Sequence, residues 1–412
     1  MTTLQSTILR TPVIQISQQA GIPNNQLDLA LEPEAAAIFC KECSVKTDGS
    51  TFEPGTQYIL VDLGGGTADI TVHEVAPSGK LKELSPPSGG AWGGTKIDSG
   101  FKTVLKTIYG KSVFSSFKNN NKDDALDMRR LVEDKKREFT IEDEYVTFKV
   151  PYSLVEEFKS SGQTLEKNVS GTQYKGKVKQ TGDKMRIDAS IMLELFNGVT
   201  TMIIQHMKKV LIRHLGVKMI LLVGGFSESK IIQQAVKKSF PLKTVIIPEE
   251  ARLAVVKGAV IYGHNPSAII SRSSPYTYGI SVAVPFDDIK HKTSKIVYKD
   301  GNRKCEDIFK IFIQAGDTVI PGKTAVQHVF NASSATSANV EIYRTESIDP
   351  IYIDDIGVSS VGSIQLLLSN TGRAAFRPIE ITMSFGSTEL SVHAMEINIR
   401  DNTVLAKFNF LH

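Results

Sequence analysis

A carboxylate stands directly before three consecutive glycines in the segment YILVDLGGGTADITVHEV, residues 58–75. The apolar residues on either side predict two β-strands joined by a tight turn. Glycine has no Cβ, so its backbone can adopt positive φ and bring N–H groups close to a ligand. A carboxylate beside such a turn can hold hydrated Mg²⁺ against bound phosphates. The segment therefore favours a phosphate-binding turn over an ordinary hairpin. The residues concerned are Asp62, Gly64, Gly65, Gly66 and Thr67.

Two further glycine pairs lie where a helix is predicted to begin. Gly93 and Gly94 precede a predicted helix that starts near residue 97, and Gly224 and Gly225 follow the apolar run MILLV at 219–223. Backbone N–H groups at a helix N-terminus favour anions. A buried strand, a glycine pair and a helix start also form the usual geometry of a nucleotide site in α/β proteins. The loop at Gly93 and Gly94 is a weak signal by itself, because such loops are common.

Two sets of charged residues allow more than one interpretation. Glu32 follows a predicted short strand at 27–31 and precedes a predicted helix at 34–42. It suits a site carboxylate or a first-turn acid that complements the helix dipole. The charged helix predicted at 123–139 would, from its pattern alone, present its charges to solvent, with Leu126, Leu131 and Val132 facing inward.

Composition is that of an ordinary globular protein. The chain has 412 residues, 41% hydrophobic and 22% charged, and its formal net charge is +4. This balance does not call for nucleic acid or an anionic membrane as partner. No apolar run reaches the roughly 18 residues of a spanning helix. The three cysteines are too few for a disulfide framework. We therefore expect no transmembrane segment and a cytoplasmic location.

The order of elements predicts an α/β region followed by an all-β region. The glycine-, proline- and serine-rich residues 76–96 are predicted as a loop, and 140–174 as strands with a polar insert. Beyond residue 276, short runs rich in valine, isoleucine and threonine predict a β-sandwich of about eight strands. Further helices are predicted up to Gly21 and at 97–108, 188–215, 230–238 and 249–263, with strands at 219–223 and 245–247.

Four motifs in order carry a resemblance to a known family: LEPEAAAIFCKE, LVDLGGGTADITVHEV, GGAWGGTKID and LVGGFSES. They resemble the seventy-kilodalton heat-shock chaperone family of the actin and sugar-kinase ATPase superfamily, and most closely its divergent type-twelve branch. The resemblance implies an actin-like (ribonuclease-H-like) nucleotide-binding fold with ATP or ADP and Mg²⁺ as ligands.

The resemblance assigns roles to individual residues. It implies that residues 64–67 contact the β- and γ-phosphates, that Asp62 is the carboxylate on the Mg²⁺ side, and that Glu32 lies near the metal and the attacking water. Glu32, Asp62 and Thr67 are thus the implied catalytic set. Leu31 stands where the main family usually has asparagine.

The implied nucleotide contacts also include the other two glycine pairs and the charged helix predicted at 123–139. For that helix, the resemblance replaces the interpretation of its charges as a solvated face. Ser229 lies near where the family has an arginine that stacks on adenine. The residues implied at the phosphate edge are Gly93 and Gly94; near ribose and adenine, Glu133, Lys136, Arg137 and Thr140; and near the α-phosphate and sugar, Gly224, Gly225 and Phe226.

The resemblance also divides the chain. It implies a remnant of lobe I at 1–57, lobe II at 58–265, a linker at 266–275, and a sandwich at 276–412 that resembles the family's peptide-binding domain without a helical lid. The family's first phosphate hairpin and a catalytic lysine have no counterpart here, so the nucleotide-binding fold is expected to be N-terminally incomplete.

The resulting functional expectation is nucleotide-responsive, chaperone-like binding of protein or peptide partners, with weak or absent ATP hydrolysis. One alternative is a nucleotide-independent scaffold. A fully active ATPase is a further alternative, and a small-molecule kinase fits least because that architecture has no place for the β-rich region.

Overall fold

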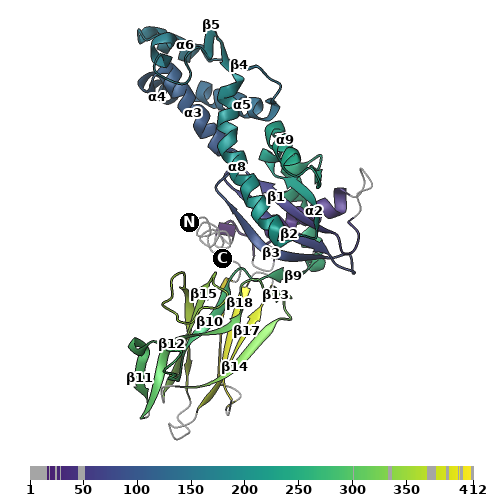
Figure 1. Ribbon diagram of the computed structural model, residues 1–412, viewed down its shortest axis with the longest axis vertical. Helices are drawn as coiled ribbons and strands as arrows, with labels where there is room; N and C mark the ends of the chain where they lie inside the picture. Colours follow the sequence, from purple (N-terminus) through teal and green to yellow (C-terminus); the bar gives the residue numbers. More distant parts are fainter. Residues whose placement is uncertain are drawn as a thin grey trace. The chain divides into compact units, whose positions relative to one another are not determined.

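The computed structural model describes residues 16–17, 19–23, 26–27, 29–44, 52–299, 301–332, 336–368, 377–386, 389–397, 399 and 402–409. The chain divides into two compact units (Figure 1). Unit 2 comprises Leu31–Val72 and Pro87–His264, and unit 1 comprises Met1–Ala30, His73–Pro86 and Asn265–His412. The helix predicted up to Gly21 lies largely outside the described residues.

A seven-stranded sheet carries the glycine turn. Five of its strands follow one another in the order β3-β2-β1-β7-β8, and residues 73–86 of this segment belong to unit 1. Strand β1 pairs in parallel with β7, and β7 pairs in parallel with β8. The register places Asp62 beside Val223, so the carboxyl ends of β1 and β7 meet at one edge of the sheet. The strands are β1 (Gln57–Leu63), β2 (Ala68–Val75), β3 (Leu81–Gly90), β7 (Val217–Val223) and β8 (Thr244–Ile246).

Strand β3 corrects the prediction of a loop over residues 76–96. Residues 81–90 are extended although two prolines interrupt them. A Cβ placed on Gly89 would lie 1.8 Å from the carbonyl oxygen of Ala68. Strands β2 and β3 therefore approach closely there only because residue 89 has no side chain.

Nine helices accompany this sheet in the described part of unit 2. They are α2 (Glu32–Ser44), α3 (Thr95–Tyr109), α4 (Lys111–Asn120), α5 (Lys122–Glu138), α6 (Tyr152–Ser160), α7 (Leu165–Val169), α8 (Ala189–Arg213), α9 (Lys230–Ser239) and α10 (Ala254–His264). A small antiparallel sheet adds β4 (Tyr145–Lys149), β5 (Val178–Thr181) and β6 (Lys184–Asp188), in the order β4-β6-β5. Helices α3 and α8 lie side by side (Figure 1).

The apolar spacing located the long helices correctly. Residues 97, 101, 104, 105 and 108 of α3 are buried as predicted. Asp188 caps α8 by accepting a hydrogen bond from the N–H of Ser190. Because residues 140–174 contain α6 and α7, the prediction of strands with a polar insert there was wrong apart from β4.

Two local predictions were also wrong. On α5, Leu126 is exposed and Leu131 half-buried, and the inward residues are Ala125, Met128, Val132 and Lys136. The described residues among 27–31 form no strand, so Glu32 is the first residue of α2 rather than the end of a strand.

Unit 1 contains two antiparallel sheets (Figure 1). The first has the order β11-β12-β10-β15-β16 and the second β14-β17-β18-β19. Burial alternates along β17 and β18, which fits strands with one face toward a core. The strands of the first sheet are β10 (Thr277–Pro285), β11 (Ile296–Lys299), β12 (Asn302–Ile313), β15 (Ser337–Thr345) and β16 (Ser359–Leu367). Those of the second are β14 (Ala325–Asn331), β17 (Pro378–Phe385), β18 (Glu389–Glu396) and β19 (Thr403–Asn409).

Aromatic side chains connect the two sheets of unit 1. The rings of Tyr278 and Phe385 lie 6.4 Å apart, and those of Phe312 and His328 lie 4.7 Å apart. Residues within the predicted linker instead form β9 (Ile269–Ser273), which pairs with β13 (Thr318–Val319). Across the described part of both units, no helix is long and apolar enough to cross a membrane.

Candidate functional site

The glycine turn after β1 is fixed by the loop that enters α3. Gly93, Gly94 and Thr95 donate their N–H groups to the carbonyl oxygens of residues 66, 64 and 65, at 3.2, 3.1 and 2.8 Å. A Cβ on Gly93 would lie 2.4 Å from the carbonyl oxygen of Gly65, so this approach requires glycine. The three N–H groups at the start of α3 thus hold the turn rather than pointing at a ligand.

The tip of the turn keeps its own donors available. Gly65 and Gly66 are exposed, and no hydrogen bond within the described part of the chain uses their N–H groups. The N–H of Gly64 is bonded to the carbonyl oxygen of Thr67 at 3.0 Å. A turn of fixed shape with two N–H groups that have no partner among the described residues can donate hydrogen bonds to an anionic oxygen without reorganising.

Asp62 lies beside the third glycine pair. Gly224 has φ +85°, and a Cβ on it would lie 2.4 Å from Oδ1 of Asp62 and 2.5 Å from the carbonyl oxygen of Leu63. Its N–H is bonded to the carbonyl oxygen of Ala251 at 2.9 Å. Residue 224 therefore needs glycine for its backbone angle and for the space beside the carboxylate. By contrast, a Cβ on Gly225 would meet nothing within 4 Å.

Two neighbouring carboxylates act on Asp62 at this edge of the sheet. Burial raises the pKa of Asp62 to about 7, and the negative charges of Glu32 and Asp69 add to the rise. Burial also raises the pKa of Asp69, opposed by the hydrogen bond of 2.8 Å that Thr67 Oγ1 donates to it. Glu32 and Asp69 thus lie close enough to Asp62 to disfavour its ionised form, and Thr67 contacts this group through Asp69, a residue that was not singled out from sequence.

A metal ion at this edge of the sheet would need oxygen ligands from a bound molecule in addition to those of the protein. Within the described residues, no group of three or more histidine, cysteine, aspartate or glutamate side chains is arranged to hold an ion. Mg²⁺ is often bound through one or two carboxylates, with phosphate oxygens and water completing its shell. Buried Asp62 suits that arrangement, because a cation beside it would offset the repulsion from its acidic neighbours.

Lys136 of α5 is the central cation of the site. Its side chain is only 5% exposed, and its Nζ donates to Oδ1 of Asp98 at 2.8 Å and to the carbonyl oxygen of Gly94 at 3.4 Å. It is also paired with Glu133 and lies 6.0 Å from the centre of the Phe226 ring. These contacts of Lys136 thus join α5 to the loop that fixes the glycine turn.

The remaining charged residues of α5 extend this cluster. Arg137 pairs with Glu133 at 3.1 Å and with Glu228 at 3.8 Å. Thr140 lies beyond α5 and donates its N–H and hydroxyl to Asp143 at 2.7 and 3.1 Å. Burial and pairing thus remove Lys136 from the solvated face that the sequence pattern alone predicted.

Phe226 forms an apolar wall at the same place. It is buried and stacks on Phe196, with ring centres 6.2 Å apart. The partners Asp98 and Glu228 were also missed from sequence. Asp98 stands in the first turn of α3 and Glu228 in the short helix after the glycine pair, so proximity to the predicted glycines was their only signal.

The comparisons with known proteins fit this set of motifs. No family model matches the chain. It is 31% identical, over an alignment of 444 residues, to heat shock 70 kDa protein 12A of Mus musculus and of Homo sapiens, covering 93% of this chain and 66% of each relative. It is 30% identical over 389 residues to heat shock 70 kDa protein 12B of Homo sapiens, covering 90% of this chain and 57% of that protein. The chain therefore spans just under two thirds of the length of the first two relatives and less of the third.

Proposed function

Because the chain is a relative of the type-twelve branch of the seventy-kilodalton heat-shock family, we propose that it is a heat-shock-like, nucleotide-responsive binding protein. Unit 2, whose mixed α/β architecture is compatible with an actin-like ATPase fold, binds ATP or ADP with Mg²⁺. Unit 1 is a β-sandwich that binds protein or peptide partners, for which an edge strand can supply backbone hydrogen bonds. The location we propose is the cytoplasm.

The turn at residues 64–66 carries this proposal. It is held by three backbone hydrogen bonds from residues 93–95, and the N–H groups of exposed Gly65 and Gly66 make no hydrogen bond among the described residues. Such a preformed turn favours the β- and γ-phosphates, because hydrogen bonds from its N–H groups to these charged oxygens offset the free-energy cost of removing their water. Asp62, at the end of β1 beside Gly224, would hold Mg²⁺ against those phosphates.

In this proposal, the cluster around Lys136 binds the ribose and the base of the nucleotide. Glu133 and Arg137 present polar groups that are only partly exposed, and buried Phe226 forms the apolar side. On binding, Lys136 would exchange part of its pairing with Asp98 for the ligand. The cost of that exchange predicts modest nucleotide affinity.

Weak hydrolysis is the second part of the proposal. Phosphoryl transfer depends on fixing the attacking water in line with the phosphate. Glu32, the implied water-side carboxylate, is exposed and makes no hydrogen bond or ion pair within the described residues. A carboxylate that nothing holds positions water poorly, so nucleotide acts mainly as a conformational ligand.

Thermal and urea unfolding with and without Mg²⁺-ATP test the binding. Nucleotide at about 100 times its Kd should raise the free energy of unfolding by about 2.7 kcal/mol. In Asp62→Asn the dependence on Mg²⁺ should disappear while the variant stays folded. Equal stability of the natural chain with and without nucleotide would disprove nucleotide binding.

One observation favours a nucleotide-independent scaffold as the second candidate. Lys136 and Arg137 already satisfy their charges with Asp98, Glu133 and Glu228. A scaffold would bind its partners equally well with or without ATP. Phosphate release that Glu32→Ala abolishes would instead support an active ATPase.

A further inference from the structure

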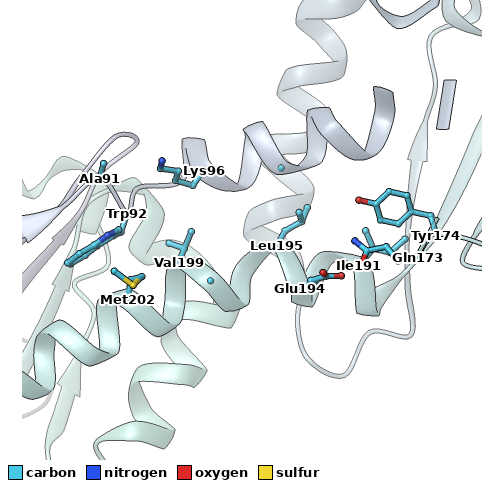
Figure 2. A pocket seen from close by; sticks show the side chains of 12 residues that line it. Ala91, Trp92, Lys96, Gln173, Tyr174, Ile191, Glu194, Leu195, Val199 and Met202 are labelled. Carbon is cyan, nitrogen blue, oxygen red and sulfur yellow. The ribbon is translucent and has the colours of Figure 1, made fainter. Parts of the chain in front are cut away.

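A hollow in unit 2 lies between α3 and α8 (Figure 2). Its volume is about 410 Å³, within the range of small-molecule pockets. None of the residues that the sequence or the resemblance assigned to nucleotide lines it. We call it the α3–α8 pocket.

The walls of the α3–α8 pocket are mainly apolar. Trp92 and Met202 lie at one end, and Val199 and Leu195 of α8 continue the wall (Figure 2). Gly198 of α8 also lines it, and a Cβ there would meet nothing within 4 Å. The missing side chain therefore contributes directly to the space.

Trp92 is held as a platform at its end of the pocket. Its ring lies 5.4 Å from the ring of His206, at 58°. His206 in turn is hydrogen-bonded to the hydroxyl of Ser88 at 2.9 Å. An indole fixed from behind can present its other surface to a flat apolar ligand at little entropic cost.

Two charged side chains line the pocket from opposite helices. Lys96 projects from α3 on the side near Trp92, and Glu194 lies on α8 toward Tyr174 (Figure 2). Neither has an ion-pair partner among the described residues. Both can therefore bind groups of a ligand without first breaking an interaction within the protein.

We propose that the α3–α8 pocket binds a small aromatic anion that also carries a hydrogen-bond donor. The ring lies against Trp92 and Met202, the anionic group pairs with Lys96, and the donor reaches Glu194. Aromatic surface provides most of the affinity, and the two charges set orientation and selectivity.

Anilinonaphthalene sulfonate is a suitable probe, because it combines an aromatic body, an anion and an N–H donor. Trp92 is the only tryptophan in the chain, so energy transfer from tryptophan to the bound probe reports binding near this pocket. We expect saturable quenching of Trp92 that fits one site, with matching enhancement of probe emission. Probe enhancement without saturable quenching would overturn the proposal.

Gly198→Leu tests whether the probe occupies the α3–α8 pocket, because the leucine side chain would fill part of it. Leucine has better helix propensity than glycine, and a Cβ at residue 198 meets no atom within 4 Å, so we expect the variant to fold. Filling the pocket should weaken probe binding by about tenfold or more. Unchanged affinity in a folded Gly198→Leu protein would contradict the assignment.

Reversing the charge of Lys96 tests whether this residue pairs with the anionic group of the ligand. This test does not depend on the outcome for Gly198→Leu. Lys96→Glu should weaken binding of anilinonaphthalene sulfonate by about tenfold but leave the uncharged analogue phenylnaphthylamine nearly unaffected. The matched control is Lys102→Glu, an exposed lysine on α3 that does not line the pocket. Equal effects on both probes, no effect on either, or equal effects of both variants would overturn the role of Lys96.

Discussion

At the scale of single residues, the carboxylate of Asp62 stands out because its surroundings oppose its charge. It is 6% exposed, and burial followed by the charges of Glu32 and Asp69 raises its pKa from 3.8 to about 7. The ionised form is thus less favourable in the folded protein than in the unfolded chain. A cation bound beside Asp62 would stabilise the ionised carboxylate and so reduce the free-energy cost of its burial.

The pH dependence of stability should show this directly. Because the folded-state pKa is raised, the contribution of Asp62 is greatest below pH 3.8 and is lost as pH rises to about 7. We expect Asp62→Asn to be more stable than the natural chain above about pH 7, by a few kcal/mol, and to lack this pH-dependent loss. Urea unfolding across that range measures it. Exposed Asp127→Asn serves as the control, and the same pH slope in Asp62→Asn as in the natural chain would contradict the assignment.

The glycine pair beside Asp62 offers a matched comparison. Gly224→Ala places a Cβ 2.4 Å from Oδ1 of Asp62 at a backbone φ of +85°. Strain and collision should together cost about 3 kcal/mol. Gly225→Ala adds the same methyl group where nothing lies within 4 Å, and it should change stability by less than about 1 kcal/mol. Similar unfolding free energies for the two variants would refute this account.

At the scale of elements, the sequence predicted those with strong local signals. The strands around residues 64–66 and helices α3 and α8 have apolar spacing and clear ends, so local reasoning located them. Strand β3 was missed because Pro86, Pro87 and Gly89 are turn signals, and only pairing with neighbouring chain makes the segment extended. Tertiary context there overrides propensity.

The candidate site was predictable to the same extent. Its glycines and Asp62 follow from local motifs, but Lys136 and its partner Asp98 are 38 residues apart. An ion pair of that separation leaves no mark on local spacing, so the pattern alone placed the charge in solvent. The resemblance assigned Lys136 to the nucleotide but did not identify Asp98, because only the fold brings α3 and α5 together.

Helices α3 and α8 each carry a glycine in their interior, and the two should respond differently to alanine. Gly198→Ala on α8 meets nothing within 4 Å, so it should stabilise by about 0.5–1 kcal/mol through helix propensity. Gly100→Ala on α3 puts its Cβ 2.7 Å from Cδ2 of Leu195, so part or all of that gain should be lost. Equal stabilisation of both variants in urea unfolding would show that α3 and α8 have room to separate.

At the scale of the whole molecule, the proposed function requires that nucleotide in unit 2 and a peptide in unit 1 affect each other's binding. Such coupling is reciprocal: Mg²⁺-ATP must change the affinity for the peptide by the same factor by which the peptide changes the affinity for Mg²⁺-ATP. We expect a factor of the order of ten, typical of coupled sites.

Titration calorimetry with an unfolded, apolar peptide, with and without Mg²⁺-ATP, measures one side of this cycle, and nucleotide titration with and without peptide measures the other. Asp62→Asn should remove the Mg²⁺-dependent coupling but leave peptide affinity without nucleotide unchanged, because Asp62 lies in unit 2 and outside the two antiparallel sheets of unit 1. Peptide binding that is indifferent to nucleotide in the natural chain, together with intact nucleotide binding, would leave the two units as independent binding modules. Peptide binding with no nucleotide binding at all would instead establish the scaffold, since Lys136 and Arg137 would then be serving only the internal ion pairs seen around Gly94.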